Sequence, residues 1–247
     1  MSGDRLIVRR RIGDIETPVS AMLKLGPEKP GTFLFESILG GERLGRYSFV
    51  GVEPLLWFRI AGGKAETSIS GQFDDARPVA GDPVAALRAF AKQARADTDE
   101  PDLPPMASGA FGYIGYDMIQ YVEPVEITAR DDLKVPEALL LIPGVVIIFD
   151  HLYQELILIA RSDGDNVEGA EARLAKVEEA LQTLTPVSPR DREADTLDFT
   201  SNTERAAISR WWRRPWPMPA PAILSRSCRA SAFRPPSGDS RSASTGR

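Results

Sequence analysis

A carboxylate, two hydroxyls and a guanidinium lie close together in one short stretch of the sequence, residues 33–51. An apolar run ends at Glu36 and Ser37, a glycine-rich turn follows, and a basic and aromatic run then carries Arg46 and Ser48. Such groups can hold a small zwitterion, with Glu36 facing an ammonium and Arg46 facing a carboxylate. The stretch is therefore a candidate binding site.

Each of these residues also has a simpler explanation. Arg46 can pair with Glu42 or Glu53 on the surface of a hairpin, where ion pairs contribute little. Ser37 can merely end a strand, as serines often do. A hairpin with a surface ion pair is therefore the alternative to a ligand site.

Other residues that carry chemistry are scarce. The single histidine, His151, follows Asp150 between two apolar runs, so we expect a solvated histidine at a strand end or turn rather than a catalytic base. The single cysteine, Cys228, excludes a disulfide within the chain and a cysteine-based zinc site, and it fits a reducing, cytoplasmic compartment. We therefore predict no metal site in this chain.

The glycine run from Gly109 to Gly115 superficially resembles a phosphate-binding loop. It lacks the lysine and threonine that end such a loop, and Tyr113 and Ile114 fill spaces that a nucleotide requires. We instead expect the glycines to allow close backbone packing beneath aromatic side chains.

The elements that position these groups are both strands and helices. Apolar runs predict strands at residues 32–35, 47–52, 55–60, 139–149 and 152–160. Turns are predicted at Glu53–Pro54, at 61–63 and near Asp150–His151, so the last two strands form a buried antiparallel pair. A helix of about four turns is predicted from Asp82–Pro83, and a second from Val167 to Leu184 with apolar residues three and four apart.

The composition is that of a soluble globular protein, with 43% hydrophobic and 26% charged residues. The net charge of −5 does not indicate a protein that binds nucleic acid. The N-terminal arginines surround an apolar run too short for a signal peptide. The longest apolar stretch, 138–149, is broken by Pro143 and is too short to span a bilayer. We expect neither a nucleic-acid nor a membrane partner.

Four stretches, in order, resemble the large subunit (component I) family of anthranilate synthase. Residues 33–51 closely resemble the signature LLES…GRYSF-G, with Leu34–Phe35 in place of its Leu-Leu pair. Residues 17–24 resemble TPVSAYLKL, residues 109–117 resemble GGAVGYFGYD, and residues 199–202 resemble the junction to the catalytic half. In that family the signature belongs to the allosteric pocket for L-tryptophan, the feedback inhibitor of the pathway.

The resemblance implies roles for the four residues of the candidate site. Ser37 falls on a recognised effector-binding position, Glu36 and Ser48 match neighbouring motif positions, and Arg46 is carried over with them. The family's chorismate and Mg²⁺ ligands lie in the catalytic half, so no catalytic residue and no cofactor are assigned to this chain, and the enzyme class, a lyase, belongs to the parent. The implied partner is a glutamine amidotransferase subunit (component II).

The resemblance also implies an α+β fold of packed antiparallel β-sheets with peripheral helices and a disordered C-terminal tail. We assign residues 1–195 to the N-terminal domain, 196–210 to the junction and 211–247 to the tail. The parent reaction converts chorismate and ammonia from glutamine into anthranilate and pyruvate, and the fragment is expected to be inactive. Alternatives are the N-terminal part of aminodeoxychorismate synthase component I and a stand-alone tryptophan-binding module.

The composition changes abruptly near residue 206. Residues 206–247 contain eight arginines, eight serines, six prolines, no lysine and one acid, Asp239. Three of the four tryptophans lie between 211 and 216, and the prolines there exclude a helix. A nucleic-acid arm would also be basic and aromatic.

The genetic code offers another explanation of the tail. Permitted codons for residues 211–233, read one base earlier, can encode MVEKAMAYARAGDPFQVVPSQRF. This translation resembles AGDIFQVVLSQRF, the family segment expected after the junction. We therefore expect a frameshift near residues 208–210 and a tail translated out of frame, in a chain truncated before the chorismate-binding domain.

Overall fold

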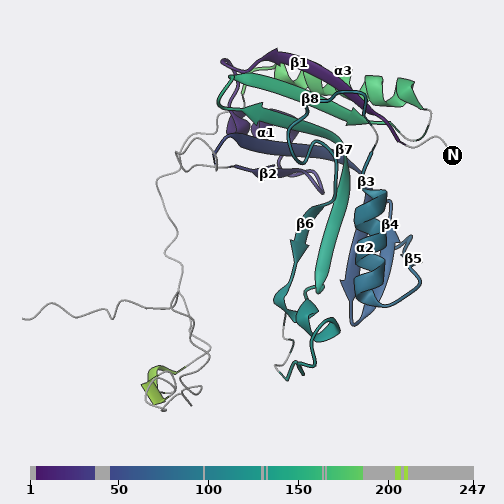
Figure 1. The fold of residues 1–247 in the computed structure, drawn as a ribbon. Coiled ribbons are helices and arrows are strands. Elements are labelled where there is room, and N and C mark those ends of the chain that lie inside the picture. The colour runs from purple at the N-terminus through teal and green to yellow at the C-terminus, as the bar shows by residue number, and fades with distance from the viewer. Residues whose placement is uncertain are drawn as a thin grey trace, which may run out of the picture. The chain divides into compact units, whose positions relative to one another are not determined.

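The computed structural model describes residues 4–36, 45–96, 98–128, 131, 133–162, 164, 166–185, 204–206 and 209–210. The chain divides into two compact units, residues 1–189 and 190–247. All helices and strands named below belong to the first unit (Figure 1). The tail that we expect to be disordered, 211–247, lies outside the described residues.

The first unit contains an eight-stranded antiparallel sheet. The strands run in the order β1-β8-β7-β3-β4-β5, with β2 added to β3 and β6 added to β7. Their bounds are β1 Leu6–Ile12, β2 Phe33–Phe35, β3 Tyr47–Ala61, β4 Lys64–Ser68, β5 Arg77–Pro78, β6 Phe111–Ile114, β7 Ala138–Asp150 and β8 Glu155–Arg161. The predicted packed sheets are thus one curled sheet, because β3 and β7 run through both of its halves (Figure 1).

Strand β3 corrects one prediction. The turn expected at Glu53–Pro54 is an irregularity within a single strand, with a register shift between Pro54 and Leu56. The backbone of Glu53 takes the left-handed conformation there, with φ of 52°. The strand continues because both of its halves pair with β7, which outweighs the hydrogen bond that Pro54 cannot donate.

Strand β7 accommodates this irregularity with a glycine. A Cβ on Gly144 would lie 2.5 Å from the carbonyl oxygen of Glu53, too close for any other residue without a shift. Both long strands therefore change course at the same level, where the sheet divides into its two halves.

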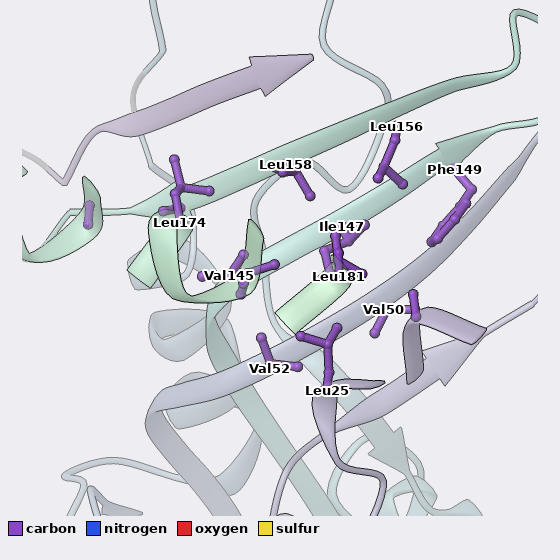
Figure 2. Packing of buried hydrophobic residues seen from close by; sticks show 14 residues of the cluster. Leu25, Val50, Val52, Val145, Ile147, Phe149, Leu156, Leu158, Leu174 and Leu181 are labelled. Carbon is purple, nitrogen blue, oxygen red and sulfur yellow. The ribbon is translucent and has the colours of Figure 1, made fainter. Parts of the chain in front are cut away.

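Two helices cover one face of the first half of the sheet. Helix α1 (Pro18–Leu25) starts with a capping box between Thr17 and Ser20, and α3 (Val167–Leu181) starts at Asn166. Figure 2 shows apolar side chains from β3, β7 and β8 packed against α1 and α3. The helix predicted from Val167 to Leu184 ends at Leu181, so Leu184 lies beyond it and is exposed, as is Val167. The other apolar residues predicted for this helix are buried: Ala170, Leu174, Val177 and Leu181.

Helix α2 (Pro83–Gln93) covers the second half of the sheet. It begins where predicted, with the Asp82 carboxylate accepting hydrogen bonds from the backbone of Val84 and Ala85. Its Phe90 ring stacks on Phe58 of β3, with 4.7 Å between ring centroids. At the end of this half, the predicted turn at Gly62–Gly63 joins β3 to β4 as a two-residue hairpin with positive φ at both glycines.

Of the glycines from Gly109 to Gly115, Gly112 and Gly115 pack closely on backbone as predicted, whereas a Cβ on Gly109 would meet no atom within 4 Å. Gly112 lies in β6, and a Cβ there would meet the carbonyl oxygen of Leu139 on β7 at 2.1 Å. The nearby Phe111 ring stacks on Phe33, whose ring in turn covers Gly51. These glycines serve close approach of backbone to backbone or to an aromatic ring.

Candidate functional site

The candidate site lies where β2 ends and β3 begins. The two strands pair antiparallel, with Phe35 opposite Phe49. Continuing that register by one residue places Glu36 opposite Ser48, so the predicted hairpin is confirmed and brings a carboxylate and a hydroxyl to the same level. Ser37 lies outside the described residues.

The predicted residues differ in exposure. The side chain of Glu36 is exposed, whereas Ser48 is fully buried. Arg46 is half-buried, with 30% of its side chain accessible. A soluble ligand can therefore contact the carboxylate of Glu36 directly. Other groups of the protein cover Ser48 and separate it from solvent.

Arg46 pairs with an acid that sequence reasoning did not single out as a partner. Its Nη2 donates to Oδ2 of Asp150 at 2.7 Å, and its Nε lies 3.1 Å from each carboxylate oxygen. Asp150 ends β7 opposite Tyr47 and is only 3% exposed. The suggested pair with Glu53 is wrong, because Glu53 pairs with Lys176 of α3.

Asp150 also organises the turn between β7 and β8. Its Oδ1 accepts hydrogen bonds from the backbone amides of Leu152 and Tyr153, at 3.0 and 3.2 Å. Burial alone would raise the pKa of Asp150, but the bonds from Arg46 and from these amides outweigh it, so its pKa lies below the ordinary value. The carboxylate is thus held in its charged form.

Two tyrosines enclose the guanidinium of Arg46. Its central carbon lies 4.8 Å from the ring centroid of Tyr47 and 4.8 Å from that of Tyr153. Both contacts are of the cation–π kind. They fix the orientation of Arg46 on the side of the sheet where Asp150 lies.

A second polar contact joins the same two segments. The Oγ of Ser48 lies 2.8 Å from Nε2 of His151, and the backbone amide of His151 donates to the carbonyl of Arg46 at 2.8 Å. His151 lies in the β7–β8 turn and is exposed, as predicted. The structure therefore brings Arg46 and Ser48 together with Asp150 and His151, which are about a hundred residues away in the sequence.

The described residues do not suggest a metal site. Within them, no group of three or more His, Cys, Asp or Glu side chains could hold a metal ion. Among the described helices, none is long and apolar enough to cross a membrane.

The sequence belongs to the chorismate binding enzyme family. The family model described as "chorismate binding enzyme" matches residues 46–213, which is more than half of the chain. The match begins at Arg46 and covers residues that we expected to precede the chorismate-binding half. The boundary expected between the two halves stays a prediction.

Curated relatives narrow the similarity to one kind of enzyme. The chain is 37% identical to anthranilate synthase component 1 of Cereibacter sphaeroides over 84% of this chain and 44% of that protein. It is 38% identical to anthranilate synthase component 1 of Thermus thermophilus over 82% of this chain and 42% of that protein. The chain thus spans less than half the length of these relatives.

A solved structure is also similar. The crystal structure of anthranilate synthase component I from Streptococcus pneumoniae TIGR4 shares 22% identity, over 71% of this chain and 37% of that chain, with a TM-score of 0.49.

Proposed function

We propose that the chain is the N-terminal, tryptophan-regulated part of an anthranilate synthase component I. The parent enzyme converts chorismate and ammonia from glutamine into anthranilate and pyruvate. The relatives support the enzyme family, and the β2–β3 register carries the regulatory part of the proposal. It ends with Phe35 opposite Phe49, and extending it by one residue places Glu36 opposite Ser48 at the hairpin end whose sequence resembles the effector signature.

The exposed groups at this hairpin end suit an amino acid. Glu36 offers a carboxylate to the ligand ammonium, and a charge-assisted bond of that kind is stronger than a neutral one. Arg46 contributes less than its charge suggests, because Asp150 already binds two of its nitrogen atoms. We propose that Arg46 holds the hairpin in place and that Glu36 binds the ligand.

The partner and the metal of the parent enzyme belong to the proposal as well. The name component 1 in the relatives implies a second component, and we propose a glutamine amidotransferase for that role. Mg²⁺ would assist chorismate chemistry in the catalytic half. The residues described in this chain do not fit a Mg²⁺ site, since no cluster of three acids or histidines exists among them, so no step is derived through it.

Two assays on the purified chain test the proposal. We expect no fluorescent anthranilate from chorismate with either glutamine or ammonia, because the proposed catalytic ligands lie elsewhere. We also expect weak, saturable binding of L-tryptophan in ligand-observed NMR, with D-tryptophan as the control. Anthranilate above a no-enzyme control, or no difference between the two enantiomers, would contradict the proposal.

Ser37 provides a test in a protein that joins this chain to the catalytic half. Ser37→Arg should relieve inhibition by L-tryptophan while leaving catalysis largely intact, because a long cation fills the pocket and repels the ligand ammonium. The rate of anthranilate formation, measured against L-tryptophan concentration, tests this prediction. An unchanged inhibition curve would remove Ser37 from the site.

We propose a frameshift as the origin of residues 211–247. The support is the alternative translation of residues 211–233 and the arginine, serine and proline content, which GC-rich codons would produce without selection. Sequencing the gene across codons 200–235 tests it. An alternative frame that does not encode the GDPFQVV and SQRF segments would end the idea.

A further inference from the structure

Among the described residues at the hairpin end, few groups could bind a ligand carboxylate. Arg46 is the cation of the motif that the structure describes, but its Nε and Nη2 are bound to Asp150 and its faces contact Tyr47 and Tyr153. Turning Arg46 toward a ligand would strip a buried carboxylate of its partner, which is costly. A described donor that is not already bound to Asp150 would therefore serve the ligand carboxylate at a lower cost.

His151 is placed to be that donor. Its ring is exposed at the start of the β7–β8 turn, and its Nε2 lies 2.8 Å from Oγ of Ser48. Extending the β2–β3 register by one residue beyond the pair Phe35–Phe49 places Ser48 opposite the exposed Glu36. Glu36 and His151 thus flank one buried serine from two different segments of the sheet.

The ring of His151 is held rather than free to swing. Its backbone amide donates to the carbonyl of Arg46, and its Nε2 is fixed by Ser48. The turn that carries it is organised by Asp150, which accepts the amides of the next two residues. A binding group fixed in this way loses little rotamer freedom when a ligand arrives.

We propose that His151 is a further residue of the effector site, which binds the carboxylate of the amino acid whose ammonium faces Glu36. The inference rests on the proposed function and deepens it, because it names the group that distinguishes an amino acid from the corresponding amine. Ser48 and Asp150 are positioning residues that act through His151. When the hydroxyl of Ser48 donates to Nε2, the ring carries its hydrogen on Nδ1, and this N–H is the group that we propose donates to the ligand carboxylate.

The single histidine makes the test direct. In chain labelled at histidine alone, every imidazole signal belongs to His151. We expect L-tryptophan to shift those signals saturably, with the same midpoint that ligand-observed NMR gives. Tryptamine, which lacks the carboxylate, should bind more weakly than L-tryptophan and leave the ring signals nearly unshifted.

Two substitutions test separately the residue proposed to bind the ligand carboxylate and the residue proposed to bind its ammonium. His151→Phe should weaken L-tryptophan by about tenfold, the equivalent of one hydrogen bond, and leave tryptamine unchanged. Glu36→Gln should weaken L-tryptophan similarly and leave indole-3-propionate, which lacks the ammonium, unchanged. Gln154→Asn is the matched control in the same turn, because asparagine tolerates the positive φ of that position.

The outcomes distinguish this inference from the proposed function. Binding of L-tryptophan with unshifted His151 signals and an unaffected His151→Phe variant overturns the role of His151 and leaves the effector site standing. Absence of any L-tryptophan binding overturns both. Should His151→Phe lose its fold by circular dichroism, His151→Leu replaces it and is expected to show the same weakening of L-tryptophan by about tenfold, and unchanged binding overturns the role of His151.

Discussion

The two ends of strand β3 are built in opposite ways. At its C-terminal end, Gly62 and Gly63 close a two-residue turn by backbone conformation alone, and the nearest ion pair, Arg59–Glu66, is half-buried, with 30% and 28% of its side chains accessible. At its N-terminal end, the chain is joined to a distant turn by a buried aspartate and a buried serine. A hairpin closes without such groups, so their presence at one end only points to a task beyond closing the chain.

The largest expected difference between the two ends is in stability. Asp150→Ala removes the partner of Arg46 and the acceptor of two turn amides, and we expect it to lower the free energy of unfolding by about 2–3 kcal/mol. Urea unfolding followed by circular dichroism measures it. A loss no greater than that of Glu66→Ala would show that the two ends are equivalent after all.

Acid should act on the N-terminal end first. The folded-state pKa of Asp150 lies below its unfolded value, so its stabilisation is complete above pH of about 4 and is lost as the pH falls through the folded-state pKa. Asp150→Asn should therefore lose less stability than the unmodified chain on acidification. Asp75, whose pKa is lowered by hydrogen bonds from Ser68 and from the backbone of Ile69, titrates alike in both proteins. Parallel stability curves in urea between pH 7 and the acid limit would contradict the assignment.

The glycine turn gives a smaller effect of a different origin. Gly62 has φ of 56°, and a Cβ added there would meet no atom within 4 Å, so Gly62→Ala meets only the backbone cost, about 1 kcal/mol. Gly62→Asn is the control and should be nearly neutral, since asparagine suits such turns. Equal losses for both variants in urea unfolding would mean that side-chain contacts matter there.

The half-buried pair Arg59–Glu66 at the same end is expected to contribute least. Glu66→Gln should change the free energy of unfolding by about 0.5 kcal/mol or less, because solvent still reaches both partners of Arg59–Glu66 and the glutamine oxygen can still accept a hydrogen bond from Arg59. The effect should shrink further in about 1 M salt. A loss approaching that of Asp150→Ala would remove the contrast between the ends of β3.

Much of the fold was predictable from local pattern. The cap at Asp82, the apolar spacing of α3 and the paired runs of β7 and β8 each carry their own short-range signal. Strand β1 and helix α1 were not predicted as elements, because β1 is rich in arginine and α1 contains only eight residues. The continuity of β3 through Pro54 depends on its pairing with β7, which no local pattern reveals.

The candidate site divides in the same way. Glu36 and Ser48 belong to one hairpin, so their proximity followed from the sequence. The partners Asp150 and His151 were visible only as a junction between two strands, because the match of Arg46 to Asp150 depends on the register of β3 on β7. The partner of a polar residue on a sheet is decided by the neighbouring strand, and a single sequence does not specify that neighbour.

The pairing of β1 has a consequence for how the protein is made. Its described partner is β8, with Leu6 opposite Arg161 and Ile12 opposite Glu155, so β1 pairs with a strand that is synthesised much later. At about 5–20 residues per second, β1 waits on the order of ten seconds for that partner. The three successive arginines, Arg9 to Arg11, keep the waiting strand charged and so resistant to pairing with other nascent chains.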